Sequence, residues 1–372
     1  MNTQVFSNIA RIVERDSKST TYKFALLRGV IDIIQENSPY ISQSGNYVFL
    51  PMGMLVYKWI IYYYPILESD KSIPQIGGAS NLAIKTDMDK LIEHYADKGR
   101  LSAFNKDIRG RGIDEAFIPA FLKLAKKIAE VIRMMPMKHI GYSINGEHYS
   151  VFAPDKAQRL NRQTEQVDLK FLIDSMGTFS IPIEYYEAFH LLGSFISGRD
   201  SIVFKWAEFS VNASGKSLPI SDALSAILTD PVKQRDAVEA SKFYKNILKN
   251  NGHLNCVWTG KSLIEDCHID HIIPYAAWNN NDLWNLLPAN GKVNGKKRDK
   301  IPSPALIDRR KDDIILCWEG LYDQHPGRFS RELQVSLIGN DSFDGWQTKA
   351  IIQLQRSCAY LIDQRGFQAW NG

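Results

Sequence analysis

One segment of this chain, Cys256–Ser303, restricts the possible folds more than any other part of the sequence. A short strand is predicted over His268–Ile273, where a proline closes it. A polar loop then leads to a second short apolar strand, predicted over Leu283–Leu287. A short helix is predicted to begin at Pro288 and Ala289. The order strand, loop, strand, helix within so short a segment predicts a small ββα unit in a protein of the α+β class.

Four polar residues stand at fixed places in this order of elements. Asp270 and His271 are adjacent near the end of the first strand, so two different chemical groups share one strand end. Asn285 lies inside the second strand, where its amide needs hydrogen-bond partners. Asn294 lies on the helix. A polar turn network is the structural alternative, but the order and the spacing favour a catalytic site.

The segment resembles the HNH nuclease family, whose domains have the ββα-metal arrangement. It is most similar to the HNH domains of CRISPR effector nucleases, which share a CxxTGK-like lead-in, an IDHIIP-like strand and a final stretch similar to NxKKxxxxPS. The resemblance covers about 50 of the 372 residues. The combined pattern is specific, whereas Asp-His or Asn-Gly alone indicates nothing.

The resemblance implies a role for each of the four residues. His271 matches the general base that activates a water for attack on phosphorus, and an imidazole with an ordinary pKa of about 6.5 accepts a proton at neutral pH. Asp270 and Asn294 match the ligands of one divalent metal. Asn285 matches the catalytic asparagine that braces the loop and orients the histidine.

The ligand types indicate which metal such a site holds. Carboxylate and amide oxygens suit a hard cation, which stabilises the leaving 3′-oxygen and the charge at phosphorus. Many family members carry histidine at the position of Asn294, and a nitrogen ligand there tolerates zinc. The oxygen ligand in this sequence favours Mg²⁺ or Mn²⁺ and argues against zinc.

Two basic stretches are candidates for contact with nucleic acid. The first has one acidic residue, Asp299, among the basic residues Lys292, Lys296, Lys297, Arg298 and Lys300. Beside a phosphodiesterase site these side chains are expected to contact phosphates, and a solvated helix end is the alternative. The second stretch, 98–111, has five basic side chains and one acidic. It has the composition of a flexible loop, which either contacts a nucleic-acid backbone or is simply solvated.

The rest of the chain is predicted to be mainly helical. Residues 1–250 form a region for recognition, regulation or assembly, with a possible strand insert over 141–185. The nuclease domain is expected over 251–305, and a helical extension over 306–372 is expected to pack on it. Helices are predicted over about 20–37, 51–65, 114–135, 184–197, 221–249 and 346–364.

Composition excludes several classes of protein. Apolar residues make up 44% and charged residues 23%, which excludes a disordered, collagen-like or coiled-coil chain. The apolar stretch Leu50–Leu67 contains Lys58 and two prolines, so it predicts a buried helix instead of a membrane span. No secretory signal is evident, and a cytoplasmic protein with free thiols is expected. No disulfide framework or zinc knuckle is predicted for the four cysteines, Cys256, Cys267, Cys317 and Cys358.

These patterns predict a metal-dependent endonuclease that hydrolyses phosphodiester bonds of nucleic acid, with DNA favoured over RNA. By resemblance, a bacterial restriction or anti-phage defence effector is expected. Residues 1–250 are expected to recognise a sequence, a protein partner or a second copy of the chain. The competing interpretation is a non-catalytic nucleic-acid-binding or assembly protein that retains an HNH shell, and the intact aspartate, histidine and asparagine positions argue against it.

Overall fold

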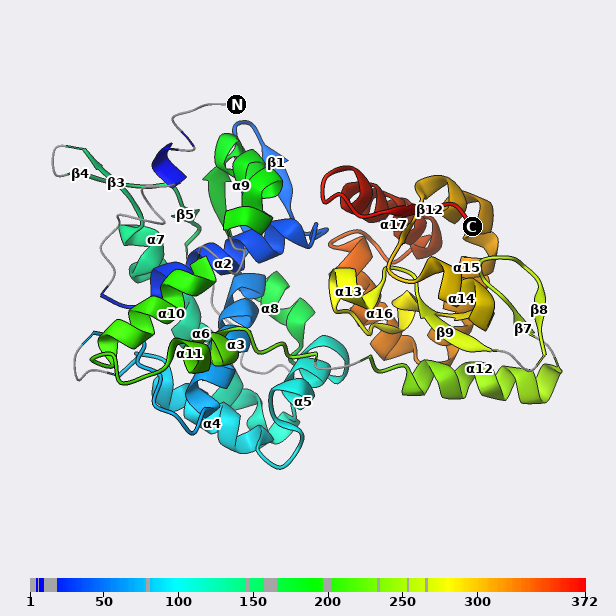
Figure 1. Ribbon diagram of the computed structural model, residues 1–372, viewed down its shortest axis with the longest axis horizontal. Helices are drawn as coiled ribbons and strands as arrows, with labels where there is room; N and C mark the ends of the chain where they lie inside the picture. Colours follow the sequence, from blue (N-terminus) through cyan, green and yellow to red (C-terminus); the bar gives the residue numbers. More distant parts are fainter. Residues whose placement is uncertain are drawn as a thin grey trace. The chain divides into compact units, whose positions relative to one another are not determined.

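A computed structural model of the chain shows two compact units, Met1–Pro231 and Val232–Gly372 (Figure 1). The division falls earlier than the boundary expected near 250. The reason is that the helix after the division packs on the C-terminal unit, where the hydroxyl of Tyr244 donates a hydrogen bond to the carbonyl oxygen of Leu286 over 3.3 Å. The structure describes residues 5, 7–9, 19–77, 81–144, 147–156, 166–196, 202–232, 235–252, 254–264 and 267–372.

The N-terminal unit is built mainly from helices around a small sheet. Its four-stranded sheet has the order β1-β2-β6-β5, with each strand antiparallel to its neighbour. The elements are α2 (Tyr22–Gln35), β1 (Ser42–Ser44), β2 (Tyr47–Pro51), α3 (Met52–Glu68), α4 (Lys85–Tyr95), α5 (Arg100–Lys106), η1 (Asp107–Arg111), η2 (Glu115–Phe117), α6 (Ile118–Met134), α7 (Pro136–His139), β3 (Gly141–Ile144), β4 (Glu147–Ser150), β5 (Ala153–Pro154), α8 (Leu169–Ser175), β6 (Thr178–Pro182), α9 (Ile183–Ile196), α10 (Ile202–Ala213) and α11 (Ile220–Ile227).

The segment 141–185 contains the predicted strands, but it is not a separate insert. Its strand β6 lies inside the four-stranded sheet, beside β2, with Val48 opposite Ile181 and Leu50 opposite Phe179. These four side chains are buried, because alternate residues of each strand face the core. The segment also contains a helix, α8, which the sequence did not predict.

Helix α3 accounts for the long apolar stretch of the sequence. It is buried along almost its whole length, including Lys58, whose ammonium contacts the carboxylate of Glu36. Close packing at its first turn requires Gly53, because a Cβ there would lie 2.1 Å from the carbonyl oxygen of Leu172 in α8. The prediction of a buried helix is confirmed. In the described ranges, no helix combines the length and the apolar character needed to cross a bilayer.

The basic stretch 98–111 is not the flexible loop that its glycines suggested. It forms helix α5 followed by η1, a turn of π-helix. Lys98 pairs with Asp114 at 3.3 Å, and Arg100 pairs with Glu68 at 3.7 Å. The apolar side chains of the stretch are buried and anchor it to the unit. Two of its basic side chains are therefore paired within the protein, which weakens the case for this stretch as a nucleic-acid contact.

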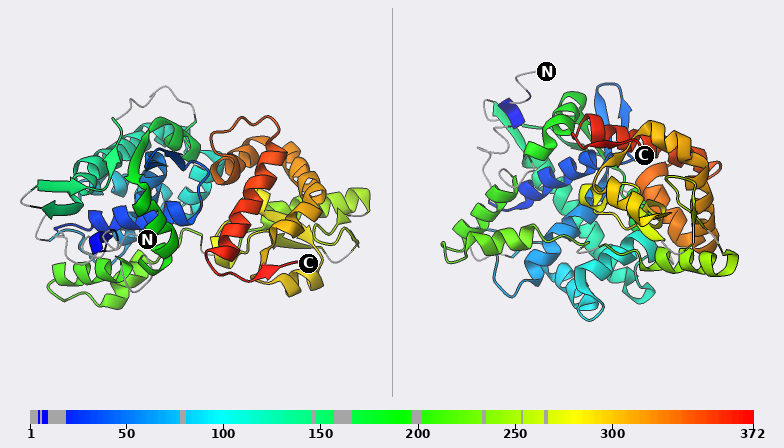
Figure 2. Two further views of the ribbon diagram at one scale, coloured as in Figure 1. Left: turned by 90° about the horizontal axis from the view of Figure 1, so that it is seen from above. Right: turned by 45° about the vertical axis from the view of Figure 1, so that its right-hand side comes forward.

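The C-terminal unit has its own core. Helix α12 packs on its two central strands (Figure 1), and α15 packs against α17 (Figure 2). The elements are α12 (Val238–Asn251), β7 (Leu254–Asn255), β8 (Ser262–Leu263), β9 (His268–His271), α13 (Tyr275–Trp278), η3 (Leu283–Asn285), β10 (Leu286–Ala289), α14 (Gly291–Lys297), β11 (Ile301–Pro302), α15 (Pro304–Gln324), α16 (Pro326–Leu333), η4 (Gln334–Ile338), α17 (Trp346–Asp363) and β12 (Ala369–Trp370).

The predicted order strand, loop, strand, helix is present, with two corrections. The second strand does not begin at Leu283, because residues 283–285 form the 3-10 turn η3 and the strand β10 follows it. The helix does not begin at Pro288, which lies in β10 opposite Ile269; helix α14 begins at Gly291. Its N-cap is the side chain of Asn290, which accepts hydrogen bonds from two backbone N–H groups of the first turn.

The short parallel pair β11–β12 joins the segment after α14 to residues near the end of the sequence. The backbone N–H of Ser303 donates a hydrogen bond to the carbonyl oxygen of Trp370 over 2.8 Å. The indole ring of Trp370 packs edge-on against that of Trp258, with 5.1 Å between their centroids. Trp370, near the end of the sequence, thereby packs on Trp258, whose neighbour Val257 donates a backbone hydrogen bond to Pro288 of β10.

Candidate active site

Strand β9 carries two of the predicted site residues. It pairs with β10 so that Asp270 lies opposite Leu287 and His271 lies opposite Leu286. Asp270 and His271 are only 5% and 6% exposed, so both groups are held inside the unit by the surrounding core. Helix α14 packs against β9 and brings the third predicted residue, Asn294, to the same part of the unit.

Asp270 is surrounded by donors. Its Oδ2 accepts a hydrogen bond from the indole Nε1–H of Trp258 over 2.7 Å. The ammonium of Lys297 lies 3.1 Å from Oδ1 and 3.0 Å from Oδ2, and it also donates to the backbone carbonyl of His271. The buried carboxylate therefore already has a positive partner from α14, as a buried charge requires.

The position of Lys297 corrects one prediction. This residue was expected on a surface that contacts phosphates, but its side chain is fully buried. The reason is helix geometry: Lys297 lies on the face of α14 that packs on β9, where Asp270 attracts it. Burial lowers the pKa of Lys297, while the adjacent Asp270 raises it. The other basic residues of the cluster stay at the surface; Lys292, Lys296 and Arg298 are exposed and Lys300 is partly exposed.

The imidazole of His271 contacts a polar and an aromatic side chain. Its Nε2 atom lies 3.0 Å from Oδ1 of Asn281, and the ring of Tyr275 packs edge-on at 5.8 Å between centroids. Burial lowers the pKa of His271 below its usual value, and the contacts with Asn281 and Asp270 oppose this effect. The imidazole is therefore neutral at neutral pH, which is the form that accepts a proton.

Asn285 holds the loop that follows His271. Its Oδ1 accepts a hydrogen bond from the N–H of Ile273 over 2.8 Å, and its Nδ2 donates to the carbonyls of Ile273 and Asn280 over 3.1 and 3.2 Å. Its own carbonyl accepts from the N–H of Ile272 over 2.8 Å. The Asn285 side chain is fully buried, and a buried amide needs hydrogen-bond partners. These contacts supply them.

Asn294 is partly buried on α14, three residues before Lys297. Residues three apart share a face of a helix, so Asn294 lies on the same side of α14 as Lys297. A carboxylate and an amide oxygen suit a hard divalent cation. Asp270 and Asn294 suit such an ion in chemical type, and a cation bound there would displace the Lys297 ammonium, which contacts both carboxylate oxygens of Asp270. Among the described residues, no group of three or more His, Cys, Asp and Glu side chains is placed to hold a metal.

The cysteines lie outside this arrangement. In the described part of the chain, all four are present as thiols without a disulfide bond. Cys256 is buried, and its sulfur accepts a hydrogen bond from the N–H of Asn290 over 3.4 Å, so it packs under the N-terminus of α14. Burial raises the pKa of Cys317 to about 12 and also raises that of Cys358 to about 12. Such thiols stay protonated and are poor metal ligands.

Two residues of the site, Asn281 and Trp258, were not predicted from the sequence, and Lys297 was predicted in another role. Asn281 contacts the imidazole, and Trp258 and Lys297 contact the carboxylate. The signal for Asn281 was the run of three asparagines, 279–281, next to the motif. Trp258 is almost completely buried, and its indole nevertheless donates a hydrogen bond to Asp270.

Family models match two parts of the chain. A model described as a domain of unknown function, DUF8808, matches residues 2–227, which is more than half of the chain. The chain belongs to the DUF8808 family. A model of HNH endonucleases matches residues 256–303. No curated protein matches the chain.

The two matches of this DUF8808 protein agree with the division of its structure. The DUF8808 match lies within the N-terminal unit, and the HNH match lies within the C-terminal unit, where it contains β9, β10 and α14. The C-terminal unit therefore contains an HNH domain. Such a domain indicates nuclease activity and binding of nucleic acid.

Proposed function

We propose that this protein is a metal-dependent endonuclease that hydrolyses phosphodiester bonds, with DNA favoured over RNA. One observation carries the proposal: the buried Asp270–His271 pair lies on β9 beside the helix that carries Asn294, within the segment that matches HNH endonucleases. A carboxylate, a neutral imidazole and an amide oxygen are the groups that metal-assisted phosphodiester hydrolysis requires.

Each residue has a role in this proposal. His271 takes the proton of the attacking water, and its lowered pKa keeps the imidazole available as a base. Asp270 and Asn294 hold Mg²⁺ or Mn²⁺, which supplies stabilisation of the negative charge on the phosphate when it is bound. Asn285 fixes the backbone after His271 and so keeps the base in place.

The exposed basic residues at the end of α14 are proposed to bind backbone phosphates. Lys292, Lys296 and Arg298 are exposed, and Lys300 is partly exposed. Contacts to phosphates give affinity without sequence choice, so this surface serves substrates of any sequence. Lys297 is not part of it, because its ammonium is paired with Asp270.

The N-terminal unit is proposed to control the nuclease. Its family model states no function, so recognition of a nucleic-acid sequence, a protein partner or a second copy of the chain is inferred from the architecture alone. A separate recognition unit joined to an HNH unit suits a restriction or anti-phage defence effector that acts in the cytoplasm. This biological role rests on analogy.

A second function has one observation in its favour. The ammonium of Lys297 already neutralises Asp270, so the site is stable without a divalent ion. A protein that binds nucleic acid through an HNH shell without cleaving it would need only this Asp270–Lys297 ion pair at the site, and no divalent ion. The two functions differ in whether the bound nucleic acid is cut.

The deciding experiment is the incubation of supercoiled plasmid with the full chain in Mg²⁺, in Mn²⁺ and in EDTA. We expect nicked or linear products with either ion and none with EDTA. His271→Ala should lower the rate by about 10²–10⁴-fold, since it removes the general base. His268→Ala is the matched control, because this exposed histidine lies on the same strand, and it should cleave at the parent rate.

Two results would contradict the proposal. Binding of the plasmid in a gel-shift assay without cleavage in either ion would favour the non-catalytic function. Equal rates for the parent chain and His271→Ala would move the active site away from β9.

A further inference from the structure

The loop between α13 and β10 is polar but largely buried. Asn280 and Asp282 are 6% and 5% exposed. Asn281 lies between them, is partly exposed, and contacts the Nε2 atom of His271. A buried polar loop keeps one conformation only when its groups have hydrogen-bond partners. The partners of this loop therefore determine where the Asn281 side chain lies.

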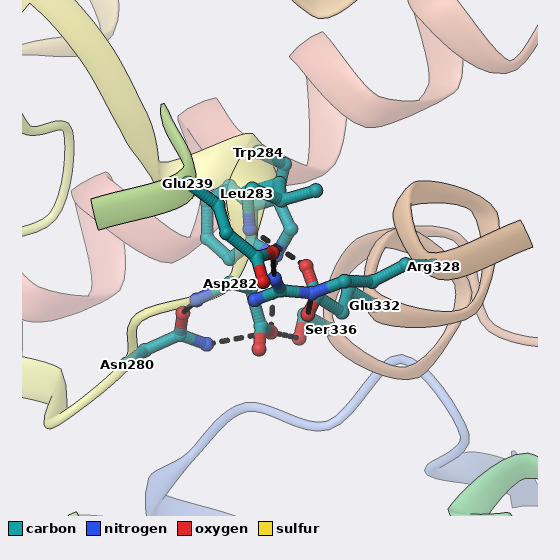
Figure 3. A network of polar contacts seen from close by, with 8 residues as sticks. All are labelled: Glu239, Asn280, Asp282, Leu283, Trp284, Arg328, Glu332 and Ser336. Atoms are coloured by element: carbon teal, nitrogen blue, oxygen red, sulfur yellow. Dashed lines mark hydrogen bonds and ion pairs between the residues drawn. The ribbon is translucent and has the colours of Figure 1, made fainter. Parts of the chain in front are cut away.

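Asp282 closes the loop on itself and joins it to a distant segment (Figure 3). Its Oδ2 accepts hydrogen bonds from the Nδ2 of Asn280 over 2.9 Å and from the Nε1 of Trp284 over 3.3 Å. The same oxygen accepts from the hydroxyl of Ser336 over 2.8 Å, and Ser336 lies in η4. In return, the side-chain oxygen of Asn280 accepts from the backbone N–H of Asp282 over 2.7 Å.

Glu332 in α16 holds the next residue of the loop (Figure 3). Its Oε2 accepts a hydrogen bond from the backbone N–H of Leu283 over 2.7 Å. Its Oε1 accepts from the Nε of Arg328 over 2.5 Å, and Arg328 also pairs with Glu239 of α12. The loop is thus tied to α12, α16 and η4. All three elements lie outside the segment that matches HNH endonucleases, since α12 precedes it and α16 and η4 follow it.

We propose that Asn281 is a positioning residue for His271, and that the contacts of Asp282 with Ser336 and of Glu332 with Leu283 hold Asn281 in place. We call these two contacts the loop clamp. The proposal rests on the proposed nuclease function, because it assigns a role in orienting the base of that reaction. It also makes part of the C-terminal helical extension a component of the catalytic unit.

The contact favours one position for the proton on the imidazole of His271. The Oδ1 of Asn281 lies 3.0 Å from Nε2, and it accepts a hydrogen bond from the tautomer that carries the proton on Nε2, which the proposal takes as the form this contact favours. In the neutral imidazole the other nitrogen, Nδ1, then has the lone pair. Nδ1 is therefore the atom that accepts the proton of the attacking water. Without Asn281, this hydrogen bond no longer favours one tautomer of the ring.

The first test compares three asparagine variants of the full chain on a fluorescein-labelled DNA duplex with Mn²⁺. Asn281→Ala should lower kcat by about 10–100-fold at an unchanged KM, as for other residues that orient a catalytic histidine. Asn281→Asp keeps an oxygen at this position and should restore most of kcat. Asn279→Ala changes an exposed asparagine of the same loop and should behave as the parent.

The second test does not depend on cleavage. Long-range ¹H–¹⁵N spectra of the chain labelled at histidine report the tautomer of each neutral imidazole, and His271→Ala assigns the signal. The parent should show the proton on Nε2, and Asn281→Ala should show a mixture. Ser336→Ala removes one contact of the loop clamp and should shift the signal in the same direction. Ser330→Ala on α16 is the matched control, since its hydroxyl contacts Pro326 instead.

The outcomes separate the possible failures. A parent kcat together with the parent tautomer in Asn281→Ala would overturn the proposal. A changed tautomer in Asn281→Ala but not in Ser336→Ala would overturn the role of the loop clamp. If the parent chain cleaves nothing, the nuclease proposal fails, and the tautomer measurement still decides whether Asn281 orients the ring.

Discussion

At the scale of single residues, Lys297 is the most informative side chain of the site. Its ammonium is the internal positive partner of Asp270 and has no exposed surface. A buried pair of this kind adds little net stability compared with apolar packing, but the loss of one partner leaves an unpaired buried charge. The same pairing gives Asp270 a defined geometry before any ion is bound.

The first prediction concerns this pair. Lys297→Met keeps the length of the side chain but removes the positive partner of the Asp270 carboxylate, which keeps its hydrogen bond from Trp258. The free energy of unfolding should fall by about 3–5 kcal/mol in EDTA. Mn²⁺ should raise the Tm of Lys297→Met more than that of the parent, because the ion replaces the missing positive charge.

Thermal unfolding with and without Mn²⁺ measures both effects. The double variant Asp270→Asn/Lys297→Met is the control, since it removes the charge that attracts the ion, and its Tm should not respond to Mn²⁺. An equal response of the parent, the single variant and the double variant would show that the ion binds elsewhere.

At the scale of elements, α16 and η4 complete the loop that faces His271. Glu332 is 3% exposed and lies near Asp282. It pairs with Arg328, which also pairs with Glu239. Burial raises the pKa of Glu332 from its usual 4.5 to about 7; Asp282 adds to this rise and Arg328 opposes it. The folded chain therefore binds a proton here more tightly than the unfolded chain does.

The second prediction follows from the sign of this shift. The contribution of Glu332 to the free energy of unfolding is fully present below about pH 4.5 and is lost as the pH rises to about 7. The loss amounts to ~3 kcal/mol at most. Glu332→Gln cannot ionise, so its unfolding free energy should fall less than that of the parent over this range.

Denaturant unfolding at several pH values tests this prediction. The quantity to compare is the slope of the free energy of unfolding against pH. Glu319→Gln on α15 is the matched control, since Glu319 is partly exposed, and it should keep the parent slope. Parallel slopes for Glu332→Gln and the parent would mean that Glu332 is ionised throughout.

The elements differ in how far the sequence predicts them. Helices α3 and α6 follow from long apolar patterns, and β9 follows from a short stretch of the motif that Pro274 closes. The burial of Lys297 was not predictable, because its partner Asp270 lies 27 residues away and the composition around Lys297 is typical of a surface. The place of Asn281 was not predictable either, because its loop is held by a glutamate 49 residues beyond Leu283.

At the scale of the whole molecule, the chain divides into two units after Pro231. The C-terminal unit has a core of its own, which includes Trp284, Trp318 and Phe329. A unit with a core of its own could in principle fold alone, and this unit contains all the residues of the candidate site. The division therefore separates the proposed chemistry from whatever the N-terminal unit recognises.

The third prediction is that the fragment 232–372 folds and cleaves nucleic acid in the presence of Mn²⁺. Cooperative thermal unfolding and the plasmid assay measure the two properties. The fragment 251–372 is the control, because it lacks α12 with Tyr244 and Glu239, and it should unfold at a lower temperature. A fragment 232–372 without cooperative unfolding would show that the two units depend on each other.

The pair β11–β12 has a consequence for the timing of synthesis. Trp258, which donates to Asp270, packs on Trp370, and the loop beside His271 is held by Glu332 and Ser336. A ribosome that adds about 5–20 residues per second needs several more seconds after the HNH segment before these supports exist. A nascent or prematurely released chain therefore lacks the finished candidate site, and under the proposed function cleavage begins only once translation has passed residue 370.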